Sequence, residues 1–251
     1  MTERSLTIRP RHPGVNKVRR SARTGADVRR MRVMAKHFVD LGGSPGGYAL
    51  LDDVQPPSAR RLAQSALASF SVEGYGGTTT RVISEQAGLS AGALYTSFPS
   101  KEDILFLCAQ RAHQSALATL ESAALIEGSA LDRVRNMMSE FTLWHAQNYM
   151  IARVCQYELA ALTSEHHDVI AKLRRSMEAA MREQIETGVA SREFDVDDVD
   201  GLTLAALSLA IDVCRWFSPA GRMSAERLAK SYADLVVRMV GSTQEATAQK
   251  A

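Results

Sequence analysis

Cysteine is scarce in this sequence, and no apolar run is long. The three cysteines, Cys108, Cys155 and Cys214, are odd in number, far apart and outside any Cys-x-x-Cys pair. This pattern argues against a disulfide framework and a zinc knuckle, and it is typical of a reducing cytoplasm. No stretch approaches the roughly 18 consecutive apolar residues of a membrane span, and no apolar run follows the basic N-terminus as in a secretory signal. We therefore expect a cytoplasmic protein that does not enter a membrane.

The composition is close to that of an average globular domain. Of the 251 residues, 45% are hydrophobic and 23% are charged, so the chain has enough apolar mass for a sizeable core, which argues against wholesale disorder. The length allows one large domain or two small ones. Apolar residues recur at helical spacing, without strand-like alternation and without an internal repeat. We therefore predict an all-α fold.

The positive charge is concentrated at the N-terminal end. Residues 1–36 contain 11 Lys or Arg and two acids, a net charge of +9, although the whole chain carries only +2. A Gly-rich breaker follows at residues 41–47, and we expect a basic, disordered extension over residues 1–55. Such an arm is attracted to polyanions, above all nucleic acid. Two alternatives stay open: a solvated extension without a partner, or a true start of the chain at Met31 or Met34.

Residues 56–103 are predicted to begin with two helices. The first follows Pro56-Pro57, carries an apolar stripe and ends at Gly74. The second is capped by the threonines of residues 78–80 and runs to Ala87.

A tight turn and two further helices complete this unit. Gly88 suits the turn because a left-handed backbone costs glycine little. Ser90 is predicted to cap a third helix over residues 91–97, which Pro99 ends. Residues 100–103 (Ser-Lys-Glu-Asp) are a variant of the capping box and open a long fourth helix.

Three helices joined by such a turn form a helix-turn-helix unit. We expect its small core to come from apolar residues of all three helices: Leu62, Ala66, Phe70, Ile83, Ala87, Leu94 and Phe98. The outer face of the third helix then keeps small or polar residues: Ala91, Gly92, Ala93, Tyr95 and Thr96. Small residues let a recognition helix sink into a major groove, and its N-terminus offers N–H groups to phosphate. From spacing alone, a packing helix stays an equal interpretation of the third helix. For Tyr95 a core aromatic is the alternative to a DNA contact.

The stretch from Gly74 to Asp103 resembles the signature of the TetR family of bacterial transcriptional regulators. It reads GYGGTTTRVISEQAGLSAGALYTSFPSKED, and nearly every fixed position of the family pattern matches. The resemblance implies phosphate contacts from Thr79 and Tyr95, and a contact of Lys101 with the DNA backbone. The predicted DNA surface consists of Thr79, Thr80, Ser90, Ala91, Gly92, Ala93, Tyr95, Thr96 and Lys101.

Two positions of this surface depart from the family pattern. Ala91 stands where the family often has lysine, which removes one common phosphate contact. Thr96 stands where it often has histidine. Because Thr96 and Ala93 occupy the positions of base contacts in the family, the operator sequence cannot be derived.

The resemblance implies a helical ligand-binding and dimerisation domain, which we place at residues 104–240, before a flexible tail at 241–251. Helical periodicity continues throughout, with breaks near residues 127–128, 147–148, 163–164, 188–198 and 218–224. The helix of about residues 198–217 is apolar on two opposite faces, so both faces must be buried. A monomeric bundle explains this pattern, and so does a twofold dimer, which also suits a pseudo-palindromic operator. The predicted dimer interface consists of Leu202, Leu209, Val213, Leu228, Tyr232, Leu235 and Met239.

A mostly apolar cavity with a few polar anchors is the usual small-molecule site. Polar or aromatic groups in the apolar helices are therefore candidate ligand contacts: Trp144, His145, Tyr149, Arg153, Tyr157, Asp212, Arg215 and Trp216. Each has a plainer explanation as well, such as a local ion pair between Asp212 and Arg215. Residues 214–235 resemble family members that control fatty-acid or steroid catabolism and respond to acyl-CoA thioesters.

Catalytic, metal and cofactor motifs are missing. Residues 165–168 (Glu-His-His-Asp) superficially suit a metal, but adjacent histidines on a helix point about 100° apart, and we interpret them as a polar helix start. No Gly-x-Ser-x-Gly elbow and no nucleotide-binding glycine loop follows a strand. We predict a protein that is not an enzyme and that needs no cofactor.

The prediction is a homodimeric repressor that binds double-stranded operator DNA and is released by a small-molecule effector of the acyl-CoA or lipid-derived type. An effector would favour a conformation whose two heads no longer match the groove spacing. One alternative is an activator or architectural DNA binder of the same fold, with the basic arm supplying nonspecific affinity. A remote alternative is an enzyme acting on a lipid thioester in the helical half.

Overall fold

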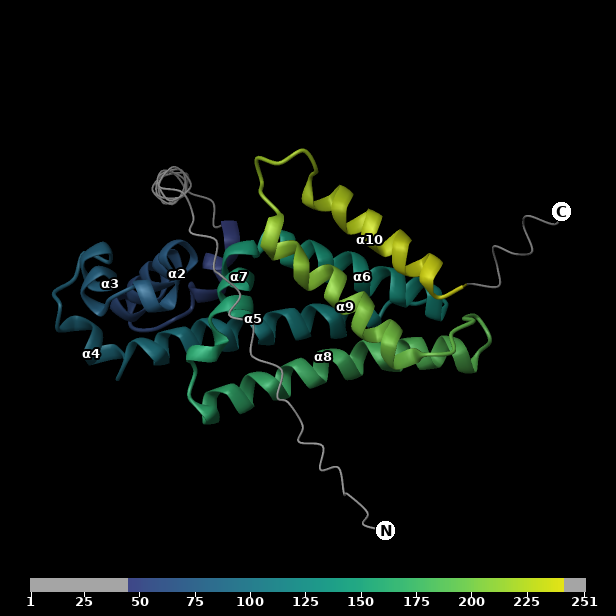
Figure 1. The fold of residues 1–251 in the computed structure, drawn as a ribbon, viewed down its shortest axis with the longest axis horizontal. Coiled ribbons are helices and arrows are strands. Elements are labelled where there is room, and N and C mark those ends of the chain that lie inside the picture. The colour runs from purple at the N-terminus through teal and green to yellow at the C-terminus, as the bar shows by residue number, and fades with distance from the viewer. Residues whose placement is uncertain (1–44, 242–251) are drawn as a thin grey trace, which may run out of the picture.

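The structure, a computed structural model, describes residues 45–241. These residues form nine α-helices and two 3-10 helices and contain no strand, which confirms the predicted all-α class. In chain order the elements are η1 (Pro45–Leu51), α2 (Pro57–Gly77), α3 (Thr80–Gln86), α4 (Ala93–Ser97), α5 (Lys101–Ala124), α6 (Ala130–Gln147), α7 (Tyr149–Tyr157), η2 (Leu159–Ala161), α8 (Ser164–Ala190), α9 (Val199–Trp216) and α10 (Ala225–Met239). Figure 1 shows α2, α3 and α4 as a head at one end of an elongated molecule, and the other helices as its body.

The head has the expected helix-turn-helix arrangement. All seven residues predicted for its small core are buried, with at most 8% of their surface exposed. Two serines of α2 hold α3 in place, because Ser65 Oγ donates to the Ile83 carbonyl and Ser69 Oγ to Gln86 Oε1, each at 2.8 Å. Gly88 has a φ of +67°, as expected for the glycine of the tight turn.

The first helix breaks at Gly74 as predicted, because Gly74 has a non-helical φ of 74°, and one further turn carries α2 to Gly77. One boundary in the head differs from the prediction. The third helix begins at Ala93 rather than Ala91, and Gly92 is its N-cap, so the prediction that Ser90 caps it is wrong. The Ser90 carbonyl instead accepts the Ala93 N–H at 3.0 Å and closes a turn. The recognition helix is therefore only five residues long.

The chain is already folded before Pro56, where a disordered extension was expected. Pro45–Leu51 forms the 3-10 helix η1, which packs against α2, α5 and α7. Leu51 is fully buried and Val54 nearly so. The predicted extension over residues 1–55 is therefore too long, because its last part carries apolar side chains that the body buries. The basic arm of residues 1–36 and the tail of residues 242–251 lie outside the described residues.

Helix α5 connects the head to the body. The predicted capping serine, Ser100, accepts the N–H groups of Glu102 and Asp103 at 3.1 and 3.3 Å. At about 1.5 Å per residue, the 24 residues of α5 span roughly 36 Å. Helix α5 packs against α6 and α8 in the body, and it therefore links the body to the head.

The body helices begin and end near the predicted breaks. Ser129 and Asp132 form a capping box at the start of α6, and Thr163 caps α8. Gly188, near the end of α8, lies against the ring of Phe194, where a Cβ would clash. Helix α9 packs on α6, α7 and α8, and α10 packs mainly on α6. Among the described residues, no helix is long and apolar enough to cross a membrane.

Candidate functional site

The outer face of the recognition helix is exposed. Tyr95 has 60% of its surface exposed, whereas the neighbouring Leu94 is fully buried. This excludes the interpretation of Tyr95 as a core aromatic. The hydroxyls of Tyr95 and Thr80 lie 3.4 Å apart, so α3 and α4 present two hydroxyls side by side. Ser90, Ala91, Gly92 and Thr96 are exposed too, and Ala93 is half-buried.

Thr79 begins α3. Its side-chain oxygen accepts the Val82 N–H at 3.2 Å, which makes it the N-cap of the helix. The hydroxyl proton of Thr79 is not used in that bond. An exposed hydroxyl at a helix N-terminus can donate to a phosphate oxygen.

Lys101 makes contacts within the head that its sequence position did not predict. Its Nζ donates to the carbonyl oxygens of Tyr75 and Thr78, at 2.6 and 2.7 Å. The same atom lies 4.0 Å from the centre of the Tyr75 ring. Burial lowers the pKa of Lys101. Lys101 therefore fixes the loop between α2 and α3, and its contact with the DNA backbone stays a prediction.

The head has no net formal charge. Residues 56–103 contain four basic and four acidic residues, and α4 contains no charged residue. Arg81 is ion-paired with Glu85 at 2.7 Å, and both side chains are largely exposed. The described part of the head therefore offers phosphate little electrostatic attraction, and its contacts rely on hydroxyl and backbone donors.

A cavity of about 570 Å³ lies in the body among α5, α6, α7, α8 and α9. This volume is in the range of small-molecule sites. Most of the walls are apolar: Ala112, Ala116, Phe141, Trp144, Ala152, Cys155, Met177, Leu204, Leu207, Ile211 and Cys214. The polar lining residues are His113, His145, Gln156, Arg174, Glu178, Ser208 and Asp212. The arrangement suits an apolar molecule with one or a few polar groups.

Three of the eight predicted ligand residues line the cavity, namely Trp144, His145 and Asp212. The other five have other contacts. Tyr149 packs near Phe217, and Arg153 Nε donates to the Cys214 carbonyl at 2.9 Å. Tyr157 and Trp216 are about half exposed on the surface.

Arg215 forms the ion pair with Asp212 that was the plainer explanation of these two residues. Its Nε and Nη2 donate to the Asp212 carboxylate at 2.7 and 2.9 Å. Hydrogen bonding to Arg215 holds the pKa of Asp212 below its usual range. Arg215 is therefore engaged outside the cavity wall.

The two cavity histidines are neutral and their tautomers are fixed. Nδ1 of His113 lies 2.7 Å from the Ala109 carbonyl, and Nδ1 of His145 lies 2.8 Å from the Phe141 carbonyl. A carbonyl oxygen only accepts, so each Nδ1 carries the proton and each Nε2 has a lone pair. Burial lowers the pKa of both rings to about 4.

Arg174 brings the only positive charge among the described lining residues. Its Nε donates to Nε2 of His113 at 3.2 Å. The two acidic lining residues have other arginines as partners, because Glu178 pairs with Arg182 at 2.8 Å and Asp212 with Arg215. In the described part of the chain Arg174 forms no ion pair, so its guanidinium is left for an anion.

Sequence reasoning missed His113, Arg174, Cys155, Gln156, Glu178 and Ser208. Arg174 and Glu178 lie on or beside the apolar stripe of α8 that Ile170, Met177 and Met181 form, a signal that could have pointed to them. His113 had a visible signal as well, since it lies on the face of α5 that carries Ala109, Ala112 and Ala116. Only the packing of five helices brings these residues together.

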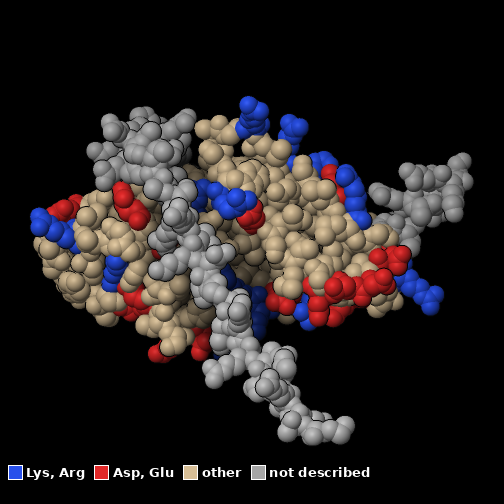
Figure 2. Space-filling view, in the orientation of Figure 1, with Lys and Arg blue, Asp and Glu red and all other residues tan. Residues whose placement is uncertain are grey.

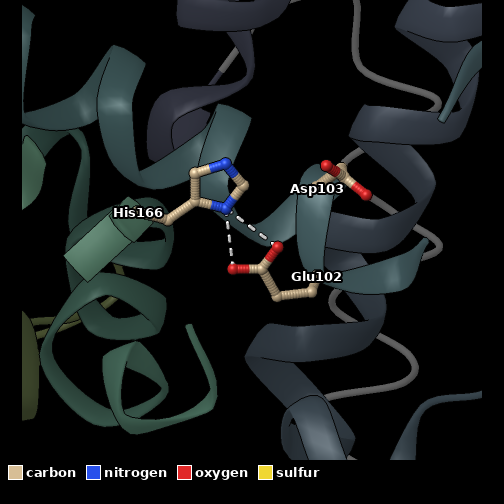
Figure 3. A group of neighbouring side chains, drawn as sticks. All are labelled: Glu102, Asp103 and His166. Carbon is tan, nitrogen blue, oxygen red and sulfur yellow. Dashed lines mark hydrogen bonds and ion pairs between the residues drawn. The ribbon is translucent and has the colours of Figure 1, made fainter. Parts of the chain in front are cut away.

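The first turns of α5 and α8 are joined by a clasp, defined here as Glu102, His166 and Thr163. Nδ1 of His166 lies 2.9 Å from both carboxylate oxygens of Glu102, and the Thr163 N–H donates to the same carboxylate at 2.9 Å. The His166 ring stacks on Phe106 with centres 3.7 Å apart. Figure 3 shows His166 reaching from α8 to Glu102, with Asp103 beside them.

Glu102, Asp103 and His166 hold ligand atoms within 4.8 Å of one another, and such a group can hold a metal ion. The protein itself already uses these atoms. Glu102 accepts from His166 and Thr163, and Asp103 accepts the Ser100 hydroxyl proton at 2.7 Å. The predicted polar helix start at residues 165–168 is confirmed, because α8 begins at Ser164 with Glu165 in its first turn.

The residues of the predicted dimer interface differ in burial. Leu202, Val213 and Leu228 are buried within the chain, so they support α9 and α10 from inside, and Leu209 and Tyr232 are partly buried. Leu235 and Met239 have 42% and 43% of their surfaces exposed. Trp216, at the end of α9, is exposed to a similar extent, with 45%. Figure 2 shows few charged side chains over the area between α9 and α10.

Two family models match most of the described chain. The one described as "Bacterial regulatory proteins, tetR family" matches residues 62–108. The one described as "Tetracyclin repressor-like, C-terminal domain" matches residues 127–240. The first match contains the helix-turn-helix, and the second contains α6 to α10 and most of the cavity lining.

Curated and solved proteins agree with these matches. A bacterial regulatory protein in the tetR family from Rhodococcus RHA1 is 36% identical, with a TM-score of 0.72 over 75% of this chain and 100% of that chain. The HTH-type transcriptional repressor KstR2 of Mycolicibacterium smegmatis is 23% identical over 206 residues, 77% of this chain and 96% of the relative. AibR in complex with isovaleryl coenzyme A and operator DNA shares the fold, at 19% identity and a TM-score of 0.65 over 71% of this chain and 97% of that chain.

The family and these relatives are regulators, which confirms the prediction that the chain is not an enzyme. The resemblance seen in residues 74–103 is confirmed as well, and it now extends over the body. The chain belongs to the TetR family of bacterial transcriptional regulators.

Proposed function

We propose that this regulator is a homodimeric repressor that an anionic, mostly apolar effector of the acyl-CoA class releases from its operator. The observation that carries the proposal is the cavity. Its walls are apolar, Arg174 supplies a positive charge without a carboxylate partner among the described residues, and α5 leads from its wall into the head.

The relatives support the two halves of this proposal. KstR2 is a repressor by name, and AibR has been solved with isovaleryl coenzyme A and operator DNA. In this chain the apolar walls suit an acyl group, and Arg174 suits a carboxylate, phosphate or polarised thioester oxygen. The volume of about 570 Å³ suits the acyl end of such a molecule, with the remainder of coenzyme A outside.

Dimerisation follows from the exposed apolar residues of α9 and α10. Trp216, Leu235 and Met239 are each more than 40% exposed, and a second copy of the same face buries them by twofold symmetry. The two heads of a dimer can then contact two half-sites about 34–36 Å apart or multiples of it.

Effector binding is coupled to the head through α5. The cavity residues Ala112, His113 and Ala116 lie on α5, and Arg174 lies on α8, so a ligand contacts both helices. The clasp between Glu102 and His166 joins the first turns of the same two helices, next to the head. A ligand that moves α8 relative to α5 therefore turns the head. By linkage, effector and operator weaken each other's binding by the same factor.

The test is operator release, followed by fluorescence polarisation of a labelled duplex taken from the DNA upstream of this gene. Isovaleryl-CoA and decanoyl-CoA are titrated, with free coenzyme A as the control. Release by an acyl-CoA, with loss of that response in Arg174→Gln but not in the matched neighbour Arg175→Gln, supports the proposal. Full operator binding at saturating acyl-CoA, without any shift in melting temperature, contradicts it.

The coupling is tested separately with the clasp. In Glu102→Gln the charged partner of His166 is lost, and we expect the effector to bind but to release operator several-fold less well. His167→Gln on the same turn, outside the clasp, is the control. Equal release by both variants and the unmodified protein shows that the clasp does not carry the coupling.

A further inference from the structure

One hydrogen-bonding atom in the cavity is left unused. His145 lines the cavity and is only 6% exposed. Its Nδ1–H is donated to the Phe141 carbonyl at 2.8 Å, so Nε2 is the acceptor of the ring. No donor among the described residues is bonded to Nε2. Nε2 of His145 is not one of the fully buried polar atoms that lack a hydrogen-bond partner. The atom is therefore accessible, and the cavity is the open space beside it.

His113, the second histidine of the cavity, has a hydrogen-bond partner at both ring nitrogens. His113 likewise donates Nδ1–H to a carbonyl, that of Ala109, but its Nε2 accepts Arg174 Nε–H at 3.2 Å. Both rings keep the neutral form near pH 7, because burial lowers the pKa of each to about 4. Protonation therefore does not remove the lone pair of His145. Once an apolar ligand displaces water from the cavity, an acceptor that it leaves without a donor is costly, by an amount similar to a lost hydrogen bond.

The position of His145 indicates which part of the ligand it meets. Arg174 is an exposed residue at the cavity, whereas His145 is buried between Phe141 and Trp144, whose rings lie 4.4 and 4.9 Å away between centres. Nor can Trp144 supply the missing proton, because its Nε1–H is donated to Ser115 Oγ at 3.0 Å. An anionic group at Arg174 thus leaves the inserted, apolar part of the ligand beside His145.

We infer that the effector carries a hydrogen-bond donor, of the hydroxyl class, on its apolar part, and that His145 Nε2 accepts it. The inference rests on the proposed function, because it takes the cavity as the effector site. It narrows the ligand from any acyl chain to a hydroxylated one. A site that is built to bond a hydroxyl discriminates against the analogue without it, because the protein acceptor is then unpaired.

The experiment compares matched ligands by isothermal titration calorimetry on the full chain. The probes are decanoyl-CoA, 3-hydroxydecanoyl-CoA and 10-hydroxydecanoyl-CoA, together with the free acids of the three. We expect at least one hydroxylated compound to bind about 3- to 10-fold more tightly than its parent, the gain of one hydrogen bond to a buried acceptor. The O-methyl ether of that compound accepts but cannot donate, and it should bind no better than the parent.

Variants of two lining residues test whether His145 causes the preference for the hydroxyl. His145→Phe should remove the preference for the hydroxyl, because the hydroxylated compound loses its acceptor and the parent no longer leaves one unpaired. His145→Gln keeps an acceptor oxygen and should retain part of the preference, and Ser208→Ala, which alters another polar lining residue, should retain all of it. If His145→Phe fails to fold, the comparison of hydroxyl with methyl ether on the unmodified protein decides by itself.

The outcomes separate this inference from the proposed function. Equal affinities for hydroxylated, methylated and parent compounds overturn the inference and leave the acyl-CoA effector standing. A preference for the hydroxyl that survives in His145→Phe overturns the role of His145. Binding of no compound in either series overturns the proposed effector class, and the inference falls with it.

Discussion

The head and the body of this regulator form their functional surfaces from different kinds of contact. The candidate DNA surface of the head lies on the outside and comes from one stretch, residues 79–101. The cavity of the body lies inside and takes its walls from five helices, with lining residues from Ala112 to Cys214. A change in the head therefore alters single contacts with DNA. A change in any one of these five helices alters the walls of the cavity.

The largest expected effect comes from separating two subunits, because the head then acts alone. Leu235→Arg places a charge on the exposed apolar face of α10, where Leu235 is 42% exposed. We expect a folded monomer by light scattering and at least about a 100-fold loss of operator affinity, since one head reaches only one half-site. Leu125→Arg, at a residue 82% exposed just beyond α5, is the control and should stay dimeric. A dimeric Leu235→Arg places the interface elsewhere.

The second-largest effect is expected from deleting the basic arm of residues 1–36, which carries the positive charge that the head lacks. Residues 56–103 have no net formal charge, whereas residues 1–36 carry +9. Deleting residues 1–36 should lower affinity for operator and random DNA alike, by about tenfold or more at 50 mM salt, because fewer counterions are released. The loss should fade as salt rises, which titrations at two salt concentrations measure. Equal affinities of the full and the shortened chain at both concentrations assign DNA binding to the head alone.

The two regions were also unequally predictable from sequence. In the head, Gly88, Thr79 and Ser100 determine turns and caps with neighbours a few residues away, so their roles could be predicted. The errors there, at Ser90 and at the contacts of Lys101, concern the geometry of a short turn and a long-range hydrogen bond. The all-α class and the body breaks could be predicted for the same reason, since caps and glycines mark helix ends.

The cavity could not be predicted in the same way. A lining residue is defined by the packing of five helices, whereas a local pattern shows only which face of a helix is buried. The apolar spacing of Ile170, Met177 and Met181 marks that face in α8, but it does not show that Arg174 on the same face reaches a cavity. Arg153 and Trp216 looked like ligand contacts although they are not among the lining residues. Leu202, Val213 and Leu228 followed the correct apolar spacing, but that spacing does not separate a subunit core from an interface.

Acid should weaken the body more than the head, because the body buries two neutral histidines. The folded-state pKa of His113 and of His145 is about 4, below the ordinary value of 6.5. Between these values the unfolded chain binds protons that the folded chain does not, so stability is complete above pH 6.5 and falls as the pH decreases toward 4. We expect each ring to contribute about 1–2 kcal/mol of this loss between pH 6.5 and pH 5.

Denaturant titrations at pH 7.5, 6.5 and 5 measure that loss. His145→Phe should make the free energy of unfolding less dependent on pH over this interval, because the loss of about 1–2 kcal/mol that His145 contributes is then absent. His167→Phe, at an exposed position of α8, should leave the pH dependence unchanged. An identical slope in His145→Phe and the unmodified protein would show that His145 takes up its proton in the folded state near the ordinary pKa.

The smallest effect is that of a single hydroxyl in the head. Tyr95 is 60% exposed and its hydroxyl lies 3.4 Å from that of Thr80, so Tyr95→Phe removes a donor and leaves the packing of the ring intact. We expect a loss of about two- to fivefold in affinity that is equal for operator and random DNA, because a phosphate contact carries no sequence information. Polarisation titrations on both duplexes, with Thr96→Val as the comparison, separate the two kinds of contact. Thr96 occupies a position of base contact in the family, so Thr96→Val should change the ratio of the two affinities, whereas Tyr95→Phe should not. If Tyr95→Phe alone changes that ratio, the tyrosine contacts a base and the assignments of the two residues are exchanged.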